Sequence, residues 1–463
     1  MTEQLKLKLN DSKATRRGAL VIVAFTMMAA YYVNDVVAPL KTMLETDLAW
    51  SSTDFGFFTG GYSFLNVFFL MLIWGGLILD RFGIRFTGKL ATILMVGGTA
   101  LEYYAMTGLA GADATLFGIN EIFGYKTGVF VAFAGYSIFG VGAEVAGITV
   151  SKIIAKWFKG KELATAMGVQ VALARIGSQA GYAVAIPLAR AFGISTPVLL
   201  GLVLLLGGMI AFFVFAVMDK KLDKQMEAAA IAAGTEDEEE KFSFKDVKNI
   251  LVNPGFWLIA LLCVLFYSCV FPFQKFASEL MIIKYGINEN VAGTFAGLPA
   301  LGALILTPVF GGFIDKRGKS ASIMLLGSAM LICVHFIYAI PDINYWLVAI
   351  VLMIILGIAF SLVPSAMWPA VAKIFPVSQL GTAYALIFFI QNIGLWGIPT
   401  LIGWVLDAYC ISGKKPDGTN MYDYTVPMCI FTGIACLSLI VALLLKKADK
   451  KYGYKLEEPN IQK

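Results

Sequence analysis

Long apolar runs alternate with short polar segments along almost the whole chain. Each run is long enough to cross a hydrocarbon layer roughly 30 Å thick, which takes about 20 helical residues. The runs lack the period-two alternation of barrel strands, and a backbone in lipid must satisfy its own hydrogen bonds, so we expect helices. The pattern predicts an all-α membrane protein with twelve transmembrane helices, near residues 19–41, 55–79, 88–110, 128–152, 163–190, 196–218, 255–281, 290–313, 321–341, 345–372, 381–407 and 425–446.

One long polar insert, Asp219 to Asn253, divides these spans six and six. It contains the acidic run Glu236–Glu240, which is typical of a solvated linker. We therefore predict an N-terminal six-helix bundle (1–218), a cytoplasmic linker (219–254), and a C-terminal six-helix bundle with a cytoplasmic tail (255–463).

Composition and charge agree with this class and orient the chain. Only 14% of residues are charged, against about 25% in soluble domains. Of the 36 lysines and arginines, 28 fall on one predicted face and 7 on the other. The positive-inside rule then places both termini in the cytoplasm and explains the net charge of +5 without a nucleic-acid partner. From Lys447 onward we expect a disordered polar end.

An internal repeat relates the two predicted bundles. Residues 76–83 (GLILDRFG) and 311–318 (GGFIDKRG) align at an offset of 235, whereas matches between 158–177 and 375–394 have an offset of 217. The difference of 18 residues indicates an insertion in the outer loop 111–128. Two copies of a six-helix unit around a central site are typical of a transporter whose halves rock against each other.

The repeated loops contain aspartates next to basic residues, Asp80-Arg81 and Asp315-Lys316. Such charges can pair at the cytoplasmic face in one state and separate in another, which would make each loop a latch. The alternative is an ordinary short loop facing water. Two copies at equivalent positions favour gating roles for all four residues.

Two ionisable residues fall at mid-depth in neighbouring spans, where charge is costly and usually functional. Glu144 lies about 12 Å from the cytoplasmic end of its span, and Arg175 about 21 Å from that of the next. The repeat partners, Ser361 and Asn392, are uncharged, so the fold itself does not require charge there. The alternative is a buried Glu144–Arg175 salt bridge that only fixes packing, although such pairs stabilise weakly.

Other polar and aromatic residues are weaker candidates. Asp35 lies near the outer end of the first span, as a gate or as a solvated helix end. Lys275 and Glu279 read as a loop-facing pair at the outer end of span seven. Trp368 is a candidate for the site, because Pro364 and Pro369 interrupt its helix inside the bundle.

The repeated Gly-Asp loops resemble the signature loop of the major facilitator superfamily. Further stretches, in order along the chain, resemble the lysosomal dipeptide transporter branch of that superfamily: 31–35, 75–85, 140–144, 157–162, 174–178, 271–273, 367–369 and 379–384. The resemblance implies dipeptide transport, with Glu144 facing the peptide amino group and Arg175 its carboxylate. The segment Gln391–Gly394, which includes Asn392, also matches.

The chain also departs from the lysosomal pattern. It has no N-x-S/T sequon in an outer loop and no acidic dileucine signal, which favours a bacterial cytoplasmic membrane over a lysosome. We expect a monomer in the lipid bilayer that binds a small molecule.

Several alternatives stay open at this point. Another organic anion or an amino acid would need Arg175 alone, and a non-transporting sensor or scaffold is the rival of another class. Both uniport and proton coupling are compatible with the sequence, and in the second case Glu144 is the coupling group. We expect no enzyme, since there is no nucleophile and base set. With one histidine and no CxxC pair, we also expect no metal and no cofactor.

Overall fold

The computed structural model describes residues 8–111, 114–158, 161–233 and 244–460. The acidic run Glu236–Glu240 of the predicted linker lies outside the described residues. The helices are α1 (Lys13–Val36), α2 (Lys41–Asp47), α3 (Ser52–Phe68), α4 (Met71–Thr107), α5 (Thr127–Phe158), α6 (Leu163–Phe192), α7 (Thr196–Ala233), α8 (Phe244–Val252), α9 (Pro254–Tyr285), α10 (Glu289–Ala296), α11 (Leu298–Arg317), α12 (Ser320–Ala339), α13 (Trp346–Ile374), α14 (Val377–Tyr409) and α15 (Thr425–Tyr452). Short 3-10 turns are η1 (Leu9–Asp11) and η2 (Ala38–Leu40).

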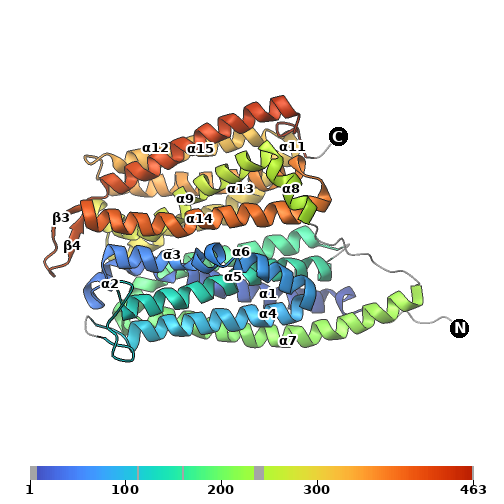
Figure 1. Ribbon diagram of the computed structural model, residues 1–463, viewed down its shortest axis with the longest axis horizontal. Helices are drawn as coiled ribbons and strands as arrows, with labels where there is room; N and C mark the ends of the chain where they lie inside the picture. Colours follow the sequence, from blue (N-terminus) through green and yellow to red (C-terminus); the bar gives the residue numbers. More distant parts are fainter. Residues whose placement is uncertain (1–7, 112–113, 159–160, 234–243, 461–463) are drawn as a thin grey trace.

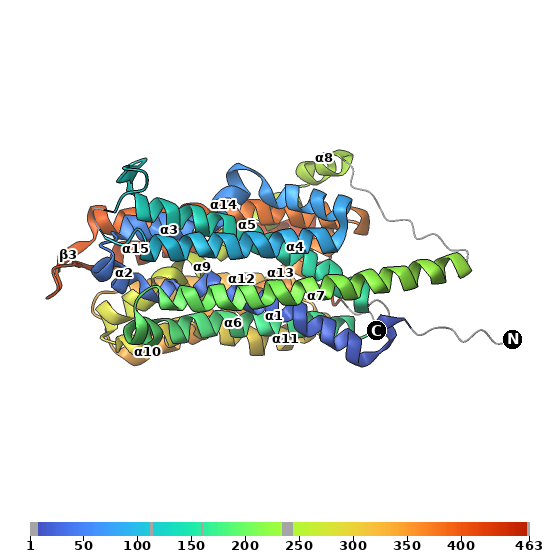
Figure 2. The ribbon, with the colours of Figure 1, turned by 90° about the horizontal axis from the view of Figure 1, so that it is seen from below.

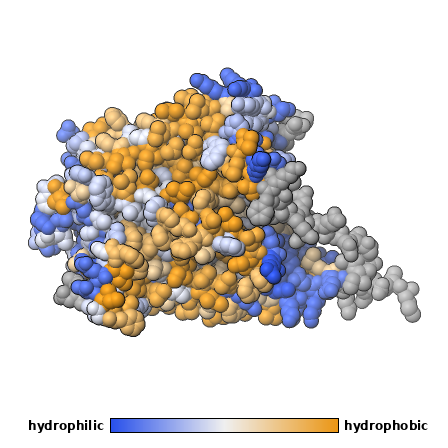
Figure 3. All heavy atoms as spheres, viewed as in Figure 1, coloured by the Kyte–Doolittle hydropathy of each residue, from blue (hydrophilic) through white to orange (hydrophobic). Residues whose placement is uncertain are grey.

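The helices run roughly side by side along the long axis of the molecule. Those from α1 to α7 lie on one side and those from α9 to α15 on the other (Figure 1). The described ends of the chain lie near the same end (Figures 1 and 2). Apolar side chains form a broad band across the middle of the surface, and hydrophilic residues gather at its two ends (Figure 3). This is the surface expected of helices that cross a bilayer.

Within the described part of the chain, nine helices are long and apolar enough to span a membrane, counting α1 with α2 and α10 with α11 as one each. α3 and α4 are bent by 58° relative to each other, and counting this pair as one span raises the number of candidate spans among the described residues to ten. α4 itself contains two helical segments, because Gly83 has φ 75° and ψ 175°. That left-handed backbone suits glycine and ends the first segment inside the predicted Gly-Asp loop. An all-α membrane fold is therefore confirmed, and the number twelve stays a prediction.

Small antiparallel ladders lie in two loops at the end opposite the termini (Figure 1). β1 (Glu121–Ile122) pairs with β2 (Tyr125–Lys126) inside the predicted insertion, with Glu121 opposite Lys126. β3 (Ile411–Lys414) pairs with β4 (Asn420–Tyr422), with Lys414 opposite Asn420.

The prediction that the chain is disordered from Lys447 onward is wrong for the described residues, which extend to Asn460. α15 continues to Tyr452, and the chain then folds back onto the start of α12. The Ser320 N–H donates to the Leu456 carbonyl at 3.0 Å, and Leu456 is fully buried. Glu457 accepts from the Ser322 N–H at 2.8 Å and so satisfies a free donor in the first turn of α12.

Candidate functional site

A cavity of about 440 Å³ lies between the two groups of helices. α1, α3, α5 and α6 line it from one side, and α9, α13 and α14 from the other. Its charged lining residues among the described ones are Glu144, Arg175 and Lys275. The rest of the lining is mostly aromatic, small or neutral polar, including Tyr31, Tyr62, Tyr136, Tyr267, Phe271, Trp368 and Phe388.

The two mid-depth charges both line this cavity, as the sequence suggested, but they do not pair. Glu144 accepts a hydrogen bond from the Tyr62 hydroxyl at 3.0 Å. The Arg175 guanidinium lies over the rings of Phe360, at 4.9 Å, and Tyr31, at 5.6 Å. Within the described chain, neither residue is in an ion pair with any other. The packing salt bridge considered from the sequence is therefore absent between them.

The ring contacts of Arg175 orient its guanidinium without neutralising it. A cation over an aromatic face gains roughly 0.5–2 kcal/mol, and the N–H groups at the edge of the guanidinium plane remain available. Phe360 comes from α13 and Tyr31 from α1, so both groups of helices position the same cation.

The other two predicted binding residues differ in position. Trp368 lines the cavity, where its Nε1–H donates to the Tyr267 hydroxyl at 3.3 Å and its ring stacks on Phe388. Asn392 is not in the lining: it is 1% exposed, and its amide donates to the Phe388 carbonyl at 2.9 Å. The neighbouring Gln391 faces the cavity instead.

Asp35 is not in the cavity lining, but it belongs to a buried network that crosses between the two groups of helices and includes the lining residues Asn34 and Lys275. Its carboxylate accepts from the Ser178 hydroxyl at 2.6 Å and from Lys275 Nζ at 3.1 Å. Lys275 also donates to the Asn34 carbonyl at 2.6 Å. The reading of Lys275 as half of a loop-facing pair is wrong, because this side chain is buried and holds α9 against α1.

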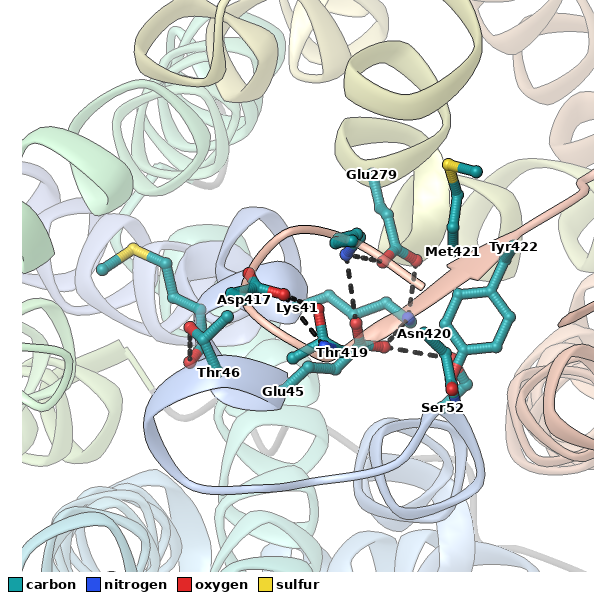
Figure 4. Close-up of polar contacts among 12 residues, drawn as sticks. Lys41, Glu45, Thr46, Ser52, Glu279, Asp417, Thr419, Asn420, Met421 and Tyr422 are labelled. Carbon is teal, nitrogen blue, oxygen red and sulfur yellow. Dashed lines mark hydrogen bonds and ion pairs between the residues drawn. The ribbon is translucent and has the colours of Figure 1, made fainter. Parts of the chain in front are cut away.

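A second charge cluster, which the sequence did not reveal, lies beside α2 and β3 at the end opposite the termini (Figures 1 and 4). Lys41 of α2 forms an ion pair with Glu45 of the same helix. It forms a second one with Glu279 of α9, in which Lys41 Nζ and Glu279 Oε2 are 2.5 Å apart. Lys415, beside β3, lies 3.5 Å from Glu45 and 3.7 Å from Glu279. The cluster holds two cations and two anions, and Lys41, Glu45 and Glu279 are at most 7% exposed. Its only sequence signal is the i, i+4 spacing of Lys41 and Glu45.

Close packing between α3 and α14 also joins the two groups of helices. Asp407 of α14 accepts from the Thr53 N–H at 2.6 Å and so caps the start of α3. A Cβ on Gly56 would lie 2.4 Å from the Pro399 carbonyl oxygen, so only glycine allows α3 and α14 to approach this closely.

The end near the termini is different. In the described ranges, every ion pair there joins residues within one group of helices, such as Asp80 with Lys152 at 3.0 Å and Arg85 with Asp223 at 2.6 Å. Among the described residues, the ion pairs that join the two groups of helices therefore lie at the end opposite the termini, and we call this the sealed end of the cavity.

The four predicted gating residues of the repeated loops lie at that other end. The exposed Asp80 pairs with the partly exposed Lys152, and Arg81 lies over the ring of Phe82 at 5.5 Å. Asp315 accepts from the Asn460 amide at 2.8 Å, and Lys316 is exposed. The two copies therefore have different partners in this structure.

If these loops are latches, Asp80→Asn and Asp315→Asn should slow transport about two- to fivefold, because exposed pairs contribute roughly 0–1 kcal/mol. Ligand affinity should stay unchanged, since the cavity is not touched. Initial uptake rates in proteoliposomes and equilibrium binding measure the two quantities. Asp342→Asn, an exposed aspartate in another loop, is the control. Parental rates in both latch variants would contradict the gating role.

Comparisons with known proteins agree with the fold. The family model "Major Facilitator Superfamily" matches residues 20–399 and 276–458. The chain is 29% identical to the human lysosomal dipeptide transporter MFSD1 over 454 residues, covering 95% of this chain and 88% of that protein. The Danio rerio protein of the same name is 27% identical over 441 residues, covering 93% and 86%.

Solved structures show the same architecture at low identity. A bacterial homologue of the human lysosomal transporter Spinster, described as inward-facing and occupied, has a TM-score of 0.67 and 13% identity, covering 97% of this chain and 100% of that chain. The peptide transporter POT in complex with sulfate has a TM-score of 0.65 and 15% identity, covering 95% of each. The chain therefore belongs to the major facilitator superfamily, as a membrane transporter similar to the lysosomal dipeptide transporter MFSD1.

Proposed function

We propose that this transporter carries dipeptides by alternating access, with Glu144 and Arg175 as the two charged ends of its binding site. The observation that carries the proposal is that both side chains line one cavity without an ionic partner in the described chain. A dipeptide at neutral pH has an ammonium at one end and a carboxylate at the other, so it can neutralise both.

The two residue types suit the two ends. A guanidinium makes two parallel hydrogen bonds to a carboxylate, which a lysine ammonium cannot do. Glu144, already oriented by Tyr62, accepts hydrogen bonds from the ammonium. Fixing both termini leaves the peptide side chains in a largely aromatic cavity that includes Tyr267 and Trp368. Selectivity is therefore strict for the termini and broad for the side chains.

The position of the ion pairs between the two groups of helices supports alternating access. The proposed bundles 1–218 and 255–463, joined by the linker 219–254, rock about the cavity. Opening the sealed end separates Asp35 from Lys275 and Lys41 from Glu279, and closing the other end brings the repeated loops together. We assign the chain, as a monomer with cytoplasmic termini, to a bacterial cytoplasmic membrane.

The test compares one dipeptide with its blocked forms. A ligand that binds the folded protein raises its melting temperature by mass action. The free dipeptide should do so, whereas its N-acetyl and C-amide forms should need about a hundredfold higher concentration, because each leaves one buried charge unpaired.

Free amino acids and small organic acids are the controls. Equal stabilisation by free and blocked dipeptides would contradict the two-ended site. Stabilisation by organic acids alone would leave Arg175 as the anion site of a different carrier.

A further inference from the structure

α7 and α15 carry the same three residues in the parts of the two helices that lie near the termini, well inside α7 and at the last turn of α15. Asp219-Lys220-Lys221 and Asp449-Lys450-Lys451 align at an offset of 230. In both copies the aspartate is buried, at 0% and 7% exposure, while both lysines are exposed.

Each buried aspartate fixes the rotation of its helix. Asp219 accepts from Lys156 Nζ at 2.8 Å and from the Trp157 indole N–H at 2.9 Å. Asp449 accepts from the Leu456 backbone N–H at 2.9 Å, within the folded-back end of the chain. Because successive helical residues turn by about 100°, an inward aspartate directs the next two side chains away from the core.

The lysines continue the apolar stripe that each helix presents to the surroundings. On α7 the exposed apolar residues Phe213, Val214 and Val217 are followed on the same face by Lys220, Lys221 and Lys224. On α15 the exposed residues Ile440, Leu443 and Leu444 are followed by Lys447, Lys450 and Lys451. These six lysines are called the basic helix ends below.

Their depth matches the surface of a bilayer. At 1.5 Å per residue, Lys220 lies about 36 Å along α7 from Thr196, and Lys450 lies about 38 Å along α15 from Thr425. Both distances exceed a hydrocarbon core of roughly 30 Å by several ångströms, so both groups lie at the level of lipid headgroups.

We propose that the basic helix ends bind the phosphate headgroups of anionic phospholipids in the leaflet nearest the termini. In the part of the chain that the structure describes, none of the six lysines is in an ion pair with an acidic residue. They face outward next to apolar side chains that are exposed to lipid, where anionic headgroups can reach them. Lysines close to an anionic surface each gain about 1 kcal/mol from it.

The test uses the purified full chain in neutral detergent, titrated with phosphatidylglycerol or with phosphatidylcholine while the melting temperature is followed. Phosphatidylglycerol should raise the parent's melting temperature more than phosphatidylcholine does, and added salt should weaken the effect. A variant with Lys220→Gln, Lys221→Gln, Lys450→Gln and Lys451→Gln should need several hundredfold more phosphatidylglycerol, because four losses of about 1 kcal/mol each add to about 4 kcal/mol. The matched variant with arginine at the same four positions should behave like the parent.

Three results would overturn the proposal: a parental response in the glutamine variant, equal stabilisation by both lipids, or equal stabilisation by inorganic phosphate, which would indicate a free anion site. If the four-fold variant does not fold, Lys220→Gln with Lys221→Gln alone should show an intermediate loss, and a parental response there also refutes the proposal. The melting temperature is measured without any transport substrate, so the result for lipid binding does not depend on whether the proposed function is correct.

Discussion

Glu144→Gln should weaken dipeptide binding by about 3 kcal/mol, roughly a hundredfold, because the peptide ammonium would then enter the cavity without a counter-charge. Tyr62 would keep its hydrogen-bond partner, so the loss reports the ligand contact more than the fold. Arg175→Gln should weaken dipeptide binding by the same amount, because the peptide carboxylate would lose its counter-charge. Arg175→Lys should lower the dipeptide affinity about tenfold, since the lysine keeps the charge but loses the paired hydrogen bonds and the ring contacts.

The assignment of each residue to one end of the ligand is checked by crossing variants with blocked ligands. N-acetylation and Glu144→Gln remove the same interaction, so their combined loss should be smaller than the sum of the two separate losses. N-acetylation and Arg175→Lys act at opposite ends, so their losses should add. Isothermal titration calorimetry on the purified protein measures all the affinities.

Two surface substitutions serve as matched controls for these variants. Glu121→Gln and Arg17→Lys make the same chemical changes at exposed positions and should bind like the parent. Additive losses for N-acetylation with Glu144→Gln would show that Glu144 does not meet the ammonium.

Lys41→Met should open the sealed end of the transporter. The substitution leaves Glu45 and Glu279 facing each other beneath the surface, with only the more distant Lys415 to balance them. Breaking a buried pair in this way costs about 3–5 kcal/mol, and the unpaired carboxylates regain water when the end opens. Each 1.4 kcal/mol shifts the balance of states tenfold, so the population of the open state should rise at least tenfold.

The measurement is the labelling rate of a cysteine at the cavity-lining Thr59 by an impermeant maleimide from the side opposite the termini, after replacement of the native cysteines. Lys284→Met is the matched control, because Lys284 is near the same end but donates to carbonyls of its own group of helices, Tyr338 and Ile340. Adding Glu279→Gln to Lys41→Met should restore part of the slow labelling. Equal rates in Lys41→Met and the parent would show that the cluster does not hold the end closed.

Much of this protein could be predicted from its sequence, because a membrane simplifies the physics. Backbone groups in lipid must bond within their own helix, so apolar runs become helices whatever they pack against. Depth along a helix follows from counting residues, which is why Glu144 and Arg175 were placed at the level of the cavity. The repeat likewise indicated a site between two related units.

Which way a side chain faces, and what it meets, depended on the tertiary structure. Neighbouring residues differ by about 100° around a helix, so Gln391 faces the cavity while Asn392 is buried. Asp35 and Lys275 are 240 residues apart in the sequence, and no local sequence pattern indicates that their helices are in contact. The buried cluster around Lys41 and the folded-back end at Leu456 arise in the same way. Their charges and donors are satisfied by partners that only the packing of distant helices supplies.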